Sequence, residues 1–224
     1  YRRGQRKITA VEQVSFCLYP GEILGLMGPS GSGKSTVAKL LAGLAEADEG
    51  EIFLDGKKIS CRKREQRKEI YRKMQMVFQS PAASFDPRRT LGDGIGESLR
   101  NAGISGKTLD ERVKELLRSC GLSEEFVRRY PHEVSGGQRQ RGAIARALAV
   151  NPKILICDEA TSALDVMAQR QILELLASLR ETRGISILFI CHNPAVVEAF
   201  CDRFLVMEQG RVIREETIPT AAVP

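Results

Sequence analysis

Nine residues near the start of the chain, GPSGSGKST at 28–36, constrain its fold more than any other stretch. They follow a short apolar segment, EILGLMG at 22–28, and they open KSTVAKLLAGL at 34–44, which is typical of a helix. The pattern fits G-x-x-x-x-G-K-[ST], in which glycines leave backbone N–H groups free to surround phosphate oxygens. A strand, a glycine-rich loop and a helix in this order predict an α/β fold with a phosphate site at the helix N-terminus.

The later part of the chain alternates strands with helices. KILICDEA at 153–160 and ISILFICH at 185–192 are short, apolar and β-branched, and the segment at 165–182 between them is typical of a helix. This alternation predicts a parallel sheet with crossover connections. Further strands are expected as a pair or one long strand at 8–19, at 50–57 with an Asp-Gly turn, at 74–79, and as a hairpin over 201–216.

The middle of the chain is mostly helical in pattern. TLGDGIGESLRNAG, TLDERVKELLRSCG and SGGQRQRGAIARALAV each have apolar residues at helical spacing. We therefore expect a single domain over 1–224. Its α/β core would comprise 1–80 and 151–224, and 81–150 would form a helical insert.

A second feature suited to an anion begins the last of these helices. VSGGQRQRGAIARALAV at 134–150 has a serine that can cap the helix and two glycines that allow close approach to its free N–H groups. Taken alone, an ordinary helix start would explain it. The chain already contains a complete phosphate loop, residues 28–36. A second phosphate contact is therefore the stronger interpretation.

Two carboxylates at the end of KILICDEA add the chemistry that a bound phosphate needs. In loops of this type Lys34 reaches the β- and γ-phosphates, Ser35 offers its hydroxyl to Mg²⁺, and Thr36 can add a phosphate contact. Asp158 is placed to hold Mg²⁺, directly or through water, and Glu159 to orient or deprotonate an attacking water. Solvated acids at a strand end are the alternative, which the phosphate loop makes weak.

The order of these motifs resembles the ATP-binding-cassette (ABC) ATPases. The phosphate loop, VSGGQ, LICDEATSALD and ICHN follow one another as in that family, over about residues 8–214. The resemblance implies a P-loop NTPase fold, with a RecA-like α/β core, an antiparallel β subdomain and an inserted α-helical subdomain. It also implies that two cassettes pack head to tail, so that the SGGQ helix of one meets the γ-phosphate held by the other.

The resemblance gives roles to individual residues. Gln79, which ends MVFQ, would touch Mg²⁺ and the attacking water, and His192 would contact the γ-phosphate; a surface glutamine and a core histidine are the alternatives. Asp165 would lie in the loop that crosses to the partner, or cap the next helix, or both. Tyr1 would stack on adenine. The family usually has Asp where this chain has Asn193, a departure that bears on the orientation of His192.

The expected site residues fall into groups by role. The catalytic candidates are Glu159, His192 and Gln79, and the Mg²⁺ candidates are Ser35, Gln79 and Asp158. ATP is expected to contact Gly28, Pro29, Ser30, Gly31, Ser32, Gly33, Lys34, Ser35, Thr36 and Tyr1. The partner's ATP is expected to contact Ser135, Gly136, Gly137 and Gln138, and the crossing loop contains Asp165.

Two stretches resemble the ABC importers for peptides and nickel. These are MVFQSPAASFDPRRT at 76–90 and YPHEVSGGQRQR at 130–141, in which His132 marks the branch, although a surface or capping role fits it as well. The chain would then be an ATPase of the translocase class at the cytoplasmic face of the inner membrane. Its implied partners are a second ATPase subunit, identical or a sister, two membrane permease subunits and, indirectly, an extracytoplasmic solute-binding protein.

The cargo is left open between nickel, or a metal chelate, and di- or oligopeptides. The chain ends soon after the expected hairpin, without a cysteine-containing extension that is common in the peptide importers. That ending leans toward nickel, and a truncated chain would look the same. The other function to weigh is an ABC ATPase that acts on nucleic acid or ribosomes. Those proteins usually carry a coiled-coil insertion or a second cassette, so no nucleic-acid partner is expected.

Charge and cysteine content limit the remaining possibilities. The net charge is +6, and the basic stretch at 61–73 fits a nucleic-acid groove, an anionic membrane surface or, most commonly, a solvated helix face with Glu65 and Glu69 interleaved. The longest apolar run, ISILFI, is far too short to span a bilayer, and no signal peptide is visible. Six cysteines without C-x-x-C spacing predict reduced thiols, several buried on strands, and no structural zinc site.

Overall fold

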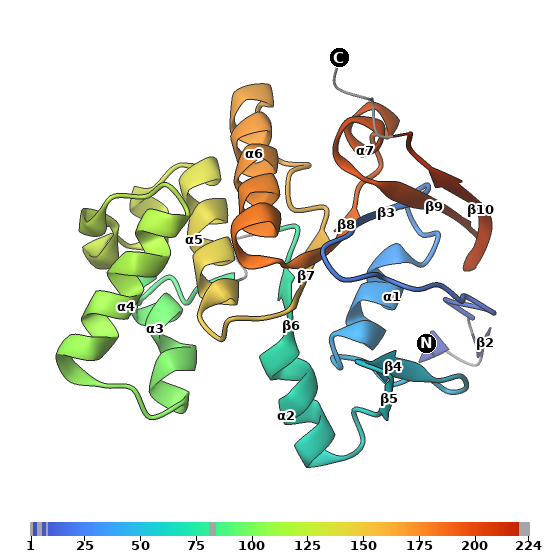
Figure 1. Cartoon of the computed structure of the whole chain (residues 1–224), viewed down its shortest axis with the longest axis horizontal. Helices are drawn as coiled ribbons and strands as arrows, with labels where there is room; N and C mark the ends of the chain where they lie inside the picture. The colour runs from blue at the N-terminus through green and yellow to red at the C-terminus, as the bar shows by residue number, and fades with distance from the viewer. Residues whose placement is uncertain (1, 4–5, 8, 81–83, 220–224) are drawn as a thin grey trace.

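A six-stranded sheet forms the centre of the molecule, with helices on both of its faces (Figure 1). The computed structural model describes residues 2–3, 6–7, 9–80 and 84–219. The strand order is β10-β9-β3-β8-β7-β6, and every neighbouring pair is parallel except β10 with β9, which confirms the expected parallel α/β sheet. The strands are β3 (Ile23–Met27), β6 (Met74–Val77), β7 (Ile154–Asp158), β8 (Ser186–Ile190), β9 (Arg203–Glu208) and β10 (Arg211–Thr217).

The central strands are buried on both faces because their sequences are almost wholly apolar. Along β8, Ile187 and Phe189 belong to one hydrophobic cluster, and Leu188 and Ile190 belong to another. Side chains of successive strand residues point to opposite faces, so the sheet separates the two clusters. The core is therefore a sheet with one apolar layer on each side.

Each apolar layer is covered by its own helices. The cluster of Leu188 and Ile190 includes residues of α1 (Lys34–Leu41) and α2 (Arg64–Lys73). The cluster of Ile187 and Phe189 includes residues of α6 (Val166–Arg183) and α7 (Pro194–Phe200). Figure 1 shows α1 and α2 on one side of the molecule and α6 on the other.

The middle of the chain forms a group of helices that pack on one another. These are α3 (Leu91–Asn101), α4 (Gly106–Ser119) and α5 (Gly136–Leu148), with short 3-10 helices η2 (Glu124–Arg128) and η3 (Pro131–Glu133) between the last two. Helix α5 also contacts α6, which joins this group to the sheet. The helices lie where the helical insert is expected; its limits at 81 and 150 stay a prediction.

Three antiparallel hairpins complete the described chain. In the hairpin of β4 (Ile52–Leu54) and β5 (Lys57–Ile59), Asp55 and Gly56 have φ angles of 51° and 73°, as an Asp-Gly hairpin turn requires. Strands β9 and β10 form a hairpin as expected, and β1 (Arg2–Arg3) pairs with β2 (Arg6–Lys7).

The strand expected over 8–19 is wrong for the part that the structure describes. Residues 9–19 form no regular strand, and position 8 lies outside the described residues. Val14, Phe16 and Leu18 nevertheless pack against the cluster that contains α1. An extended segment laid over a core buries alternate residues without pairing with another strand. The alternation therefore indicated one-sided burial, which is necessary for an edge strand but does not establish one.

The cysteines are correctly expected to be free thiols where described, but their placement differs from expectation. Cys120, Cys157, Cys191 and Cys201 are buried and Cys17 is exposed. Among the four buried thiols only Cys157 lies on a strand; the others lie just beyond the ends of α4, β8 and α7. No helix among the described residues combines the length and the apolar character needed to cross a membrane.

Candidate functional site

The glycine-rich loop between β3 and α1 has a backbone path that side chains would block. Gly28 and Gly33 have φ angles of 153° and 105°, and a Cβ atom on them would lie 2.2 Å from the carbonyl oxygen of Met207 and 2.5 Å from that of Ala10. At Gly31, with φ of 80°, an added Cβ would meet nothing within 4 Å. The loop is thus pressed against neighbouring backbone at both ends and open at its middle, where a ligand could approach.

The first residues of α1 connect this loop to the end of β7. The ammonium group of Lys34 is buried and donates to the carbonyl oxygens of Gly28 at 2.7 Å and Pro29 at 2.8 Å. Ser35 Oγ donates to Asp158 Oδ1 at 2.9 Å. Burial raises the pKa of Asp158, and the hydrogen bond from Ser35 opposes that rise. A lysine, a hydroxyl and a carboxylate therefore lie together at the N-terminus of α1.

Glu159 is held in place from two neighbouring strands. It leaves β7 with a φ of 48°, and its N–H donates to the carbonyl oxygen of Ile190 at 3.0 Å. Gln79 Nε2 donates to Glu159 Oε2 at 2.8 Å, and His192 Nδ1 lies 3.8 Å from Glu159 Oε1. A left-handed backbone is unfavourable for a glutamate, and such strained residues cluster at functional sites.

These contacts bring together residues that the sequence places far apart. Gln79 follows β6, Glu159 follows β7 and His192 follows β8. Because the three strands are parallel neighbours in the sheet, their carboxyl ends meet at one edge, which is where ligands bind in open α/β sheets. The sequence-predicted Gln79, Ser35, Asp158, Glu159 and His192 are all placed at this edge.

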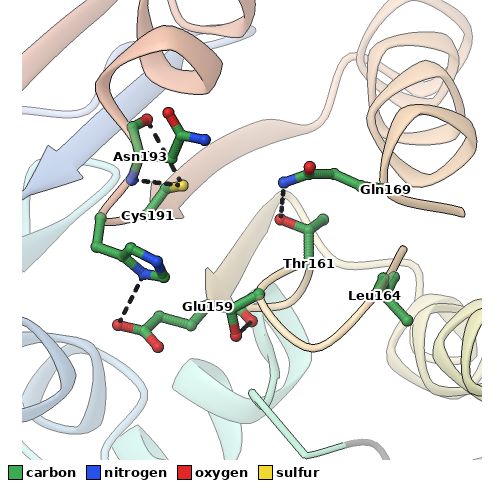
Figure 2. A pocket seen from close by; sticks show the side chains of 8 residues that line it. Glu159, Thr161, Leu164, Gln169, Cys191 and Asn193 are labelled. Carbon is green, nitrogen blue, oxygen red and sulfur yellow. Dashed lines mark hydrogen bonds and ion pairs between the residues drawn. The ribbon is translucent and has the colours of Figure 1, made fainter. Parts of the chain in front are cut away.

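A cavity of about 140 Å³ lies beside Glu159 and His192. Its lining also contains residues that sequence reasoning missed, among them Thr161 and Gln169. Gln169 Nε2 donates to Thr161 Oγ1 at 3.3 Å, a contact that ties the segment after Glu159 to α6 (Figure 2). No sequence signal marks Gln169, since an amide on the second turn of a helix has no typical role.

Asn193 serves as the N-cap of α7. Its Oδ1 accepts a hydrogen bond from the N–H of Ala195 at 3.1 Å, and its own N–H donates to the sulfur of Cys191 at 3.4 Å. Asparagine caps helices about as well as aspartate. The substitution of Asn for the usual Asp therefore keeps the local backbone that carries His192 at the end of β8.

Ser135 starts α5 with a complete capping box. Ser135 Oγ accepts from the N–H of Gln138 at 3.2 Å, and Gln138 Oε1 accepts from the N–H of Ser135 at 2.9 Å. Figure 1 places α5 next to α6 and away from α1. Gly136 lines a second cavity, of about 180 Å³, together with Gln79. The SGGQ segment is thus near Gln79.

The other predicted site residues have simple surroundings or lie outside the described part. Asp165 caps α6 through a hydrogen bond from the N–H of Ala168 to its Oδ1 at 2.9 Å. His132 is exposed, and its ring lies 5.6 Å from that of Tyr130. Tyr1 is outside the described residues.

The residues at the loop suit a nucleotide with a divalent cation. Ser32 Oγ is buried and has no hydrogen-bond partner among the described residues. A buried polar atom is normally hydrogen-bonded, so a ligand atom could bind there. Mg²⁺ prefers oxygen ligands and usually takes one or two protein groups beside substrate phosphates. Ser35 and Asp158 offer a hydroxyl and a carboxylate within 2.9 Å of each other, which fits that pattern.

Fold and site together define a P-loop nucleotide-binding domain. The ABC transporter family matches residues 11–162, and the chain belongs to this family as one of its ATP-binding domains. It is 50% identical over 212 residues to the glutathione import ATP-binding protein GsiA of Escherichia coli K12 and 48% identical over 214 residues to that of Salmonella choleraesuis. These alignments cover 94% and 95% of the chain, which spans 34% of either relative's length.

Solved structures of cassettes resemble the whole fold. The dimeric post-hydrolysis structure of the cassette MJ0796 with ADP and Pi has a TM-score of 0.88 and 34% identity, covering 97% of this chain and 94% of that one. CbiO1 from Clostridium perfringens, part of the transporter complex cbiONQ, has a TM-score of 0.84 and 29% identity, covering 93% and 82%. The expectation that the chain is an ABC cassette with a P-loop NTPase fold is thereby confirmed.

Proposed function

We propose that the chain binds ATP with Mg²⁺ and hydrolyses it to drive uptake of a small peptide-like solute across a membrane. The observation that carries the proposal is the position of Glu159. It lies between Gln79 and His192, at the same sheet edge as the Ser35–Asp158 pair. A carboxylate held in this way beside a phosphate loop is suited to orient and deprotonate a water molecule.

Each group at the site would have a separate task. The loop N–H groups and Lys34 would hold the phosphates, and Ser35 and Asp158 would hold Mg²⁺, which supplies neutralisation of charge on the transferred phosphoryl group. Glu159 would take a proton from the attacking water, and Gln79 and His192 would fix its carboxylate. Because Gln79 donates to Glu159, this contact would fix the direction in which the carboxylate points.

The site would need a second cassette to complete it. Ser135 caps an exposed helix start, on a helix that Figure 1 shows apart from α1, and an N-terminus of this kind stabilises an anion. The cassette MJ0796 forms a dimer with ADP and Pi bound, which supports the same arrangement here. The partner cassette would be an identical or sister ATPase, and both would bind permease subunits at the inner face of the membrane.

A peptide-like cargo is favoured over nickel by the relatives. GsiA is named as a glutathione import protein, and glutathione is a tripeptide. That name therefore favours a peptide-like cargo for this chain over nickel. Uptake of labelled glutathione and of ⁶³Ni²⁺ by cells with and without the gene would distinguish the two, because only the true cargo would depend on it.

The ATPase assignment is tested by phosphate release with and without Mg²⁺. Glu159→Gln keeps the size of the side chain but removes the base, so hydrolysis should fall on the order of 10²–10⁴-fold while ATP binding persists. Lys34→Ala should abolish tight ATP binding. The matched control is Glu174→Gln, since Glu174 is exposed on α6 and pairs with Arg170. Wild-type ATP binding in the Lys34→Ala variant would refute the assignment.

A further inference from the structure

The net positive charge of the chain comes from α2 and the residues just before it. Residues 57–73 contain nine Lys and Arg and two Glu, a net charge of +7. The remainder of the chain has 25 basic and 26 acidic residues. The net charge of +6 is therefore a local property of one surface, and the function proposed above does not use it.

The basic residues of α2 form a stripe along its outer side. Ile70 faces the core, whereas Arg64, Arg67, Lys68 and Arg72 are exposed. Their spacing of three or four residues places them on one side of the helix. Lys63 precedes the helix at its N-cap and is exposed as well. The expectation of a basic helix with a solvated face is correct as far as the fold is concerned.

Within the described ranges, nearby carboxylates pair with the basic residues close to the β4–β5 hairpin and with Lys73, but not with most of the stripe. Lys58 pairs with Glu51, Arg62 with Glu46, and Lys73 with Asp55 and Glu69. On the stripe itself, only Lys68 has such a partner among the described residues, Glu65 at 3.3 Å.

The remaining stripe cations have no acidic partner within 4 Å in the described part of the chain. Arg67 instead donates from Nε and Nη2 to the carbonyl oxygen of Cys61, which fixes the guanidinium without neutralising it. Three stripe cations, Arg64, Arg67 and Arg72, and Lys63 just before the helix are thus exposed and uncompensated among the described residues.

From this arrangement we infer that the outer face of α2 docks on the anionic phospholipid headgroups of the membrane. Clusters of four or more Lys and Arg on an amphipathic helix bind anionic lipid, each cation adding to the attraction near the surface. Tyr71 lies within the stripe and is 46% exposed, and its hydroxyl lies 2.7 Å from Ser98 Oγ of α3, a contact that fixes the ring beside the cations.

The same face is less suited to nucleic acid. Single-stranded binding uses several aromatic rings on which successive bases stack, and the stripe has only Tyr71. A short straight row of cations on one helix fits a flat, fluid array of headgroups. Docking of α2 could also affect the site. Only β6 (Met74–Val77) and Phe78 lie between α2 and Gln79 in the chain.

The experiment is vesicle co-sedimentation without nucleotide, so it does not depend on ATP hydrolysis. Vesicles of pure phosphatidylcholine are compared with vesicles that contain phosphatidylglycerol. Wild type should bind only the second kind, and more weakly as salt rises. The triple variant Arg64→Glu, Arg67→Glu, Arg72→Glu should bind about tenfold to a hundredfold more weakly. The control makes the same charge change on exposed positions of α4: Lys107→Glu, Arg112→Glu, Arg118→Glu.

The outcomes separate the inference from its alternatives. Loss in the α2 variant with binding kept in the α4 variant supports it. An equal loss of vesicle binding in both variants would show that binding depends on net charge alone, and would overturn the inference. Failure of wild type to bind anionic vesicles would overturn it too, and so would displacement from them by a DNA oligonucleotide at lower concentration than the lipid. If charge reversal lowers the melting temperature, the Arg→Gln triple variant gives the same comparison with less perturbation.

Discussion

At the scale of the residue, the site depends on side chains whose chemistry is set by a few contacts. Glu159 is oriented by Gln79, Ser35 is bonded to Asp158, and Lys34 is buried with its ammonium on two carbonyl oxygens. None of these contacts needs a cysteine. The thiols nearest the site, Cys157 and Cys191, flank functional residues but make no contact with the phosphate loop among their described hydrogen bonds.

The thiols should therefore differ sharply in reactivity. Burial raises the pKa of Cys120 and of Cys157 to about 12, so little thiolate forms on them at neutral pH. Cys17 is exposed. Titration of the native protein with Ellman's reagent should show a fast phase from Cys17, and the buried thiols should react only after unfolding. Cys17→Ser should remove the fastest phase and leave a slower one from the half-buried Cys61, and a fast reaction of Cys157 in that variant would contradict the described packing.

At the scale of the element, the segment between β7 and α6 connects Glu159, the proposed catalytic base, to the helix behind it. Ser162 Oγ donates to the carbonyl oxygen of Glu159 at 3.0 Å, and Asp165 caps α6. Thr161 is buried and accepts from Gln169 one turn into α6. The segment is therefore held by a hydrogen bond near each end and by one from α6 to Thr161. These contacts suit a loop that keeps Glu159 in a strained backbone conformation.

Removal of the tie in the middle should loosen this segment. A hydrogen bond contributes about 1 kcal/mol, so Gln169→Ala should increase local opening of residues 159–165 about fivefold. Hydrogen exchange followed by mass spectrometry on peptides over this range measures it. Gln171→Ala is the matched control, because Gln171 lies on the same helix, is exposed and accepts instead from Arg141. Equal exchange in the two variants would show that the Thr161 contact does not hold the loop.

At the scale of the whole molecule, the chain has two helix starts suited to an anion, and we propose that they serve different nucleotides. The phosphate loop lies before α1, and the capped start of α5 lies beside α6 (Figure 1). Each rigid element fixes its own feature in place. Two separate helix starts of this kind are explained if the start of α5 contacts the nucleotide of another cassette.

Association of two cassettes should therefore depend on ATP and on Ser135. Glu159→Gln slows hydrolysis, so ATP should accumulate a dimer that size-exclusion chromatography with light scattering can detect, with the chain alone or mixed with a sister ATPase. Adding Ser135→Arg should prevent the dimer, because a bulky cation blocks approach of the helix start to the γ-phosphate. ATP binding by the monomer should remain.

A control separates lost contact from lost helix capping. Ser135→Ala removes the cap, which costs about 1 kcal/mol, without adding bulk. It should weaken the dimer less than Ser135→Arg does. If Ser135→Arg dimerised as well as its parent, the start of α5 would not be the contact with the partner's nucleotide.

The sequence determined those parts of the protein whose cause is local. Gly28, Gly33 and Lys34 define the loop by backbone freedom and charge, the apolar runs define buried parallel strands, and Asp55 with Gly56 define a hairpin turn. Such features follow from a few adjacent residues, so spacing alone is enough to predict them. The resemblance to ABC ATPases added Gln79 and His192, which no local pattern marks as partners of Glu159.

Only the tertiary structure decided what distant segments do together. The segment at 9–19 alternates like a strand but lies on the core unpaired, because pairing depends on which edges are available rather than on its own residues. The Gln169–Thr161 contact exists because α6 returns over the loop that follows β7. The uncompensated stripe of α2 likewise depends on which carboxylates fold near it. Contacts of this kind join residues far apart in the chain, and their geometry is fixed only when the sheet and helices pack.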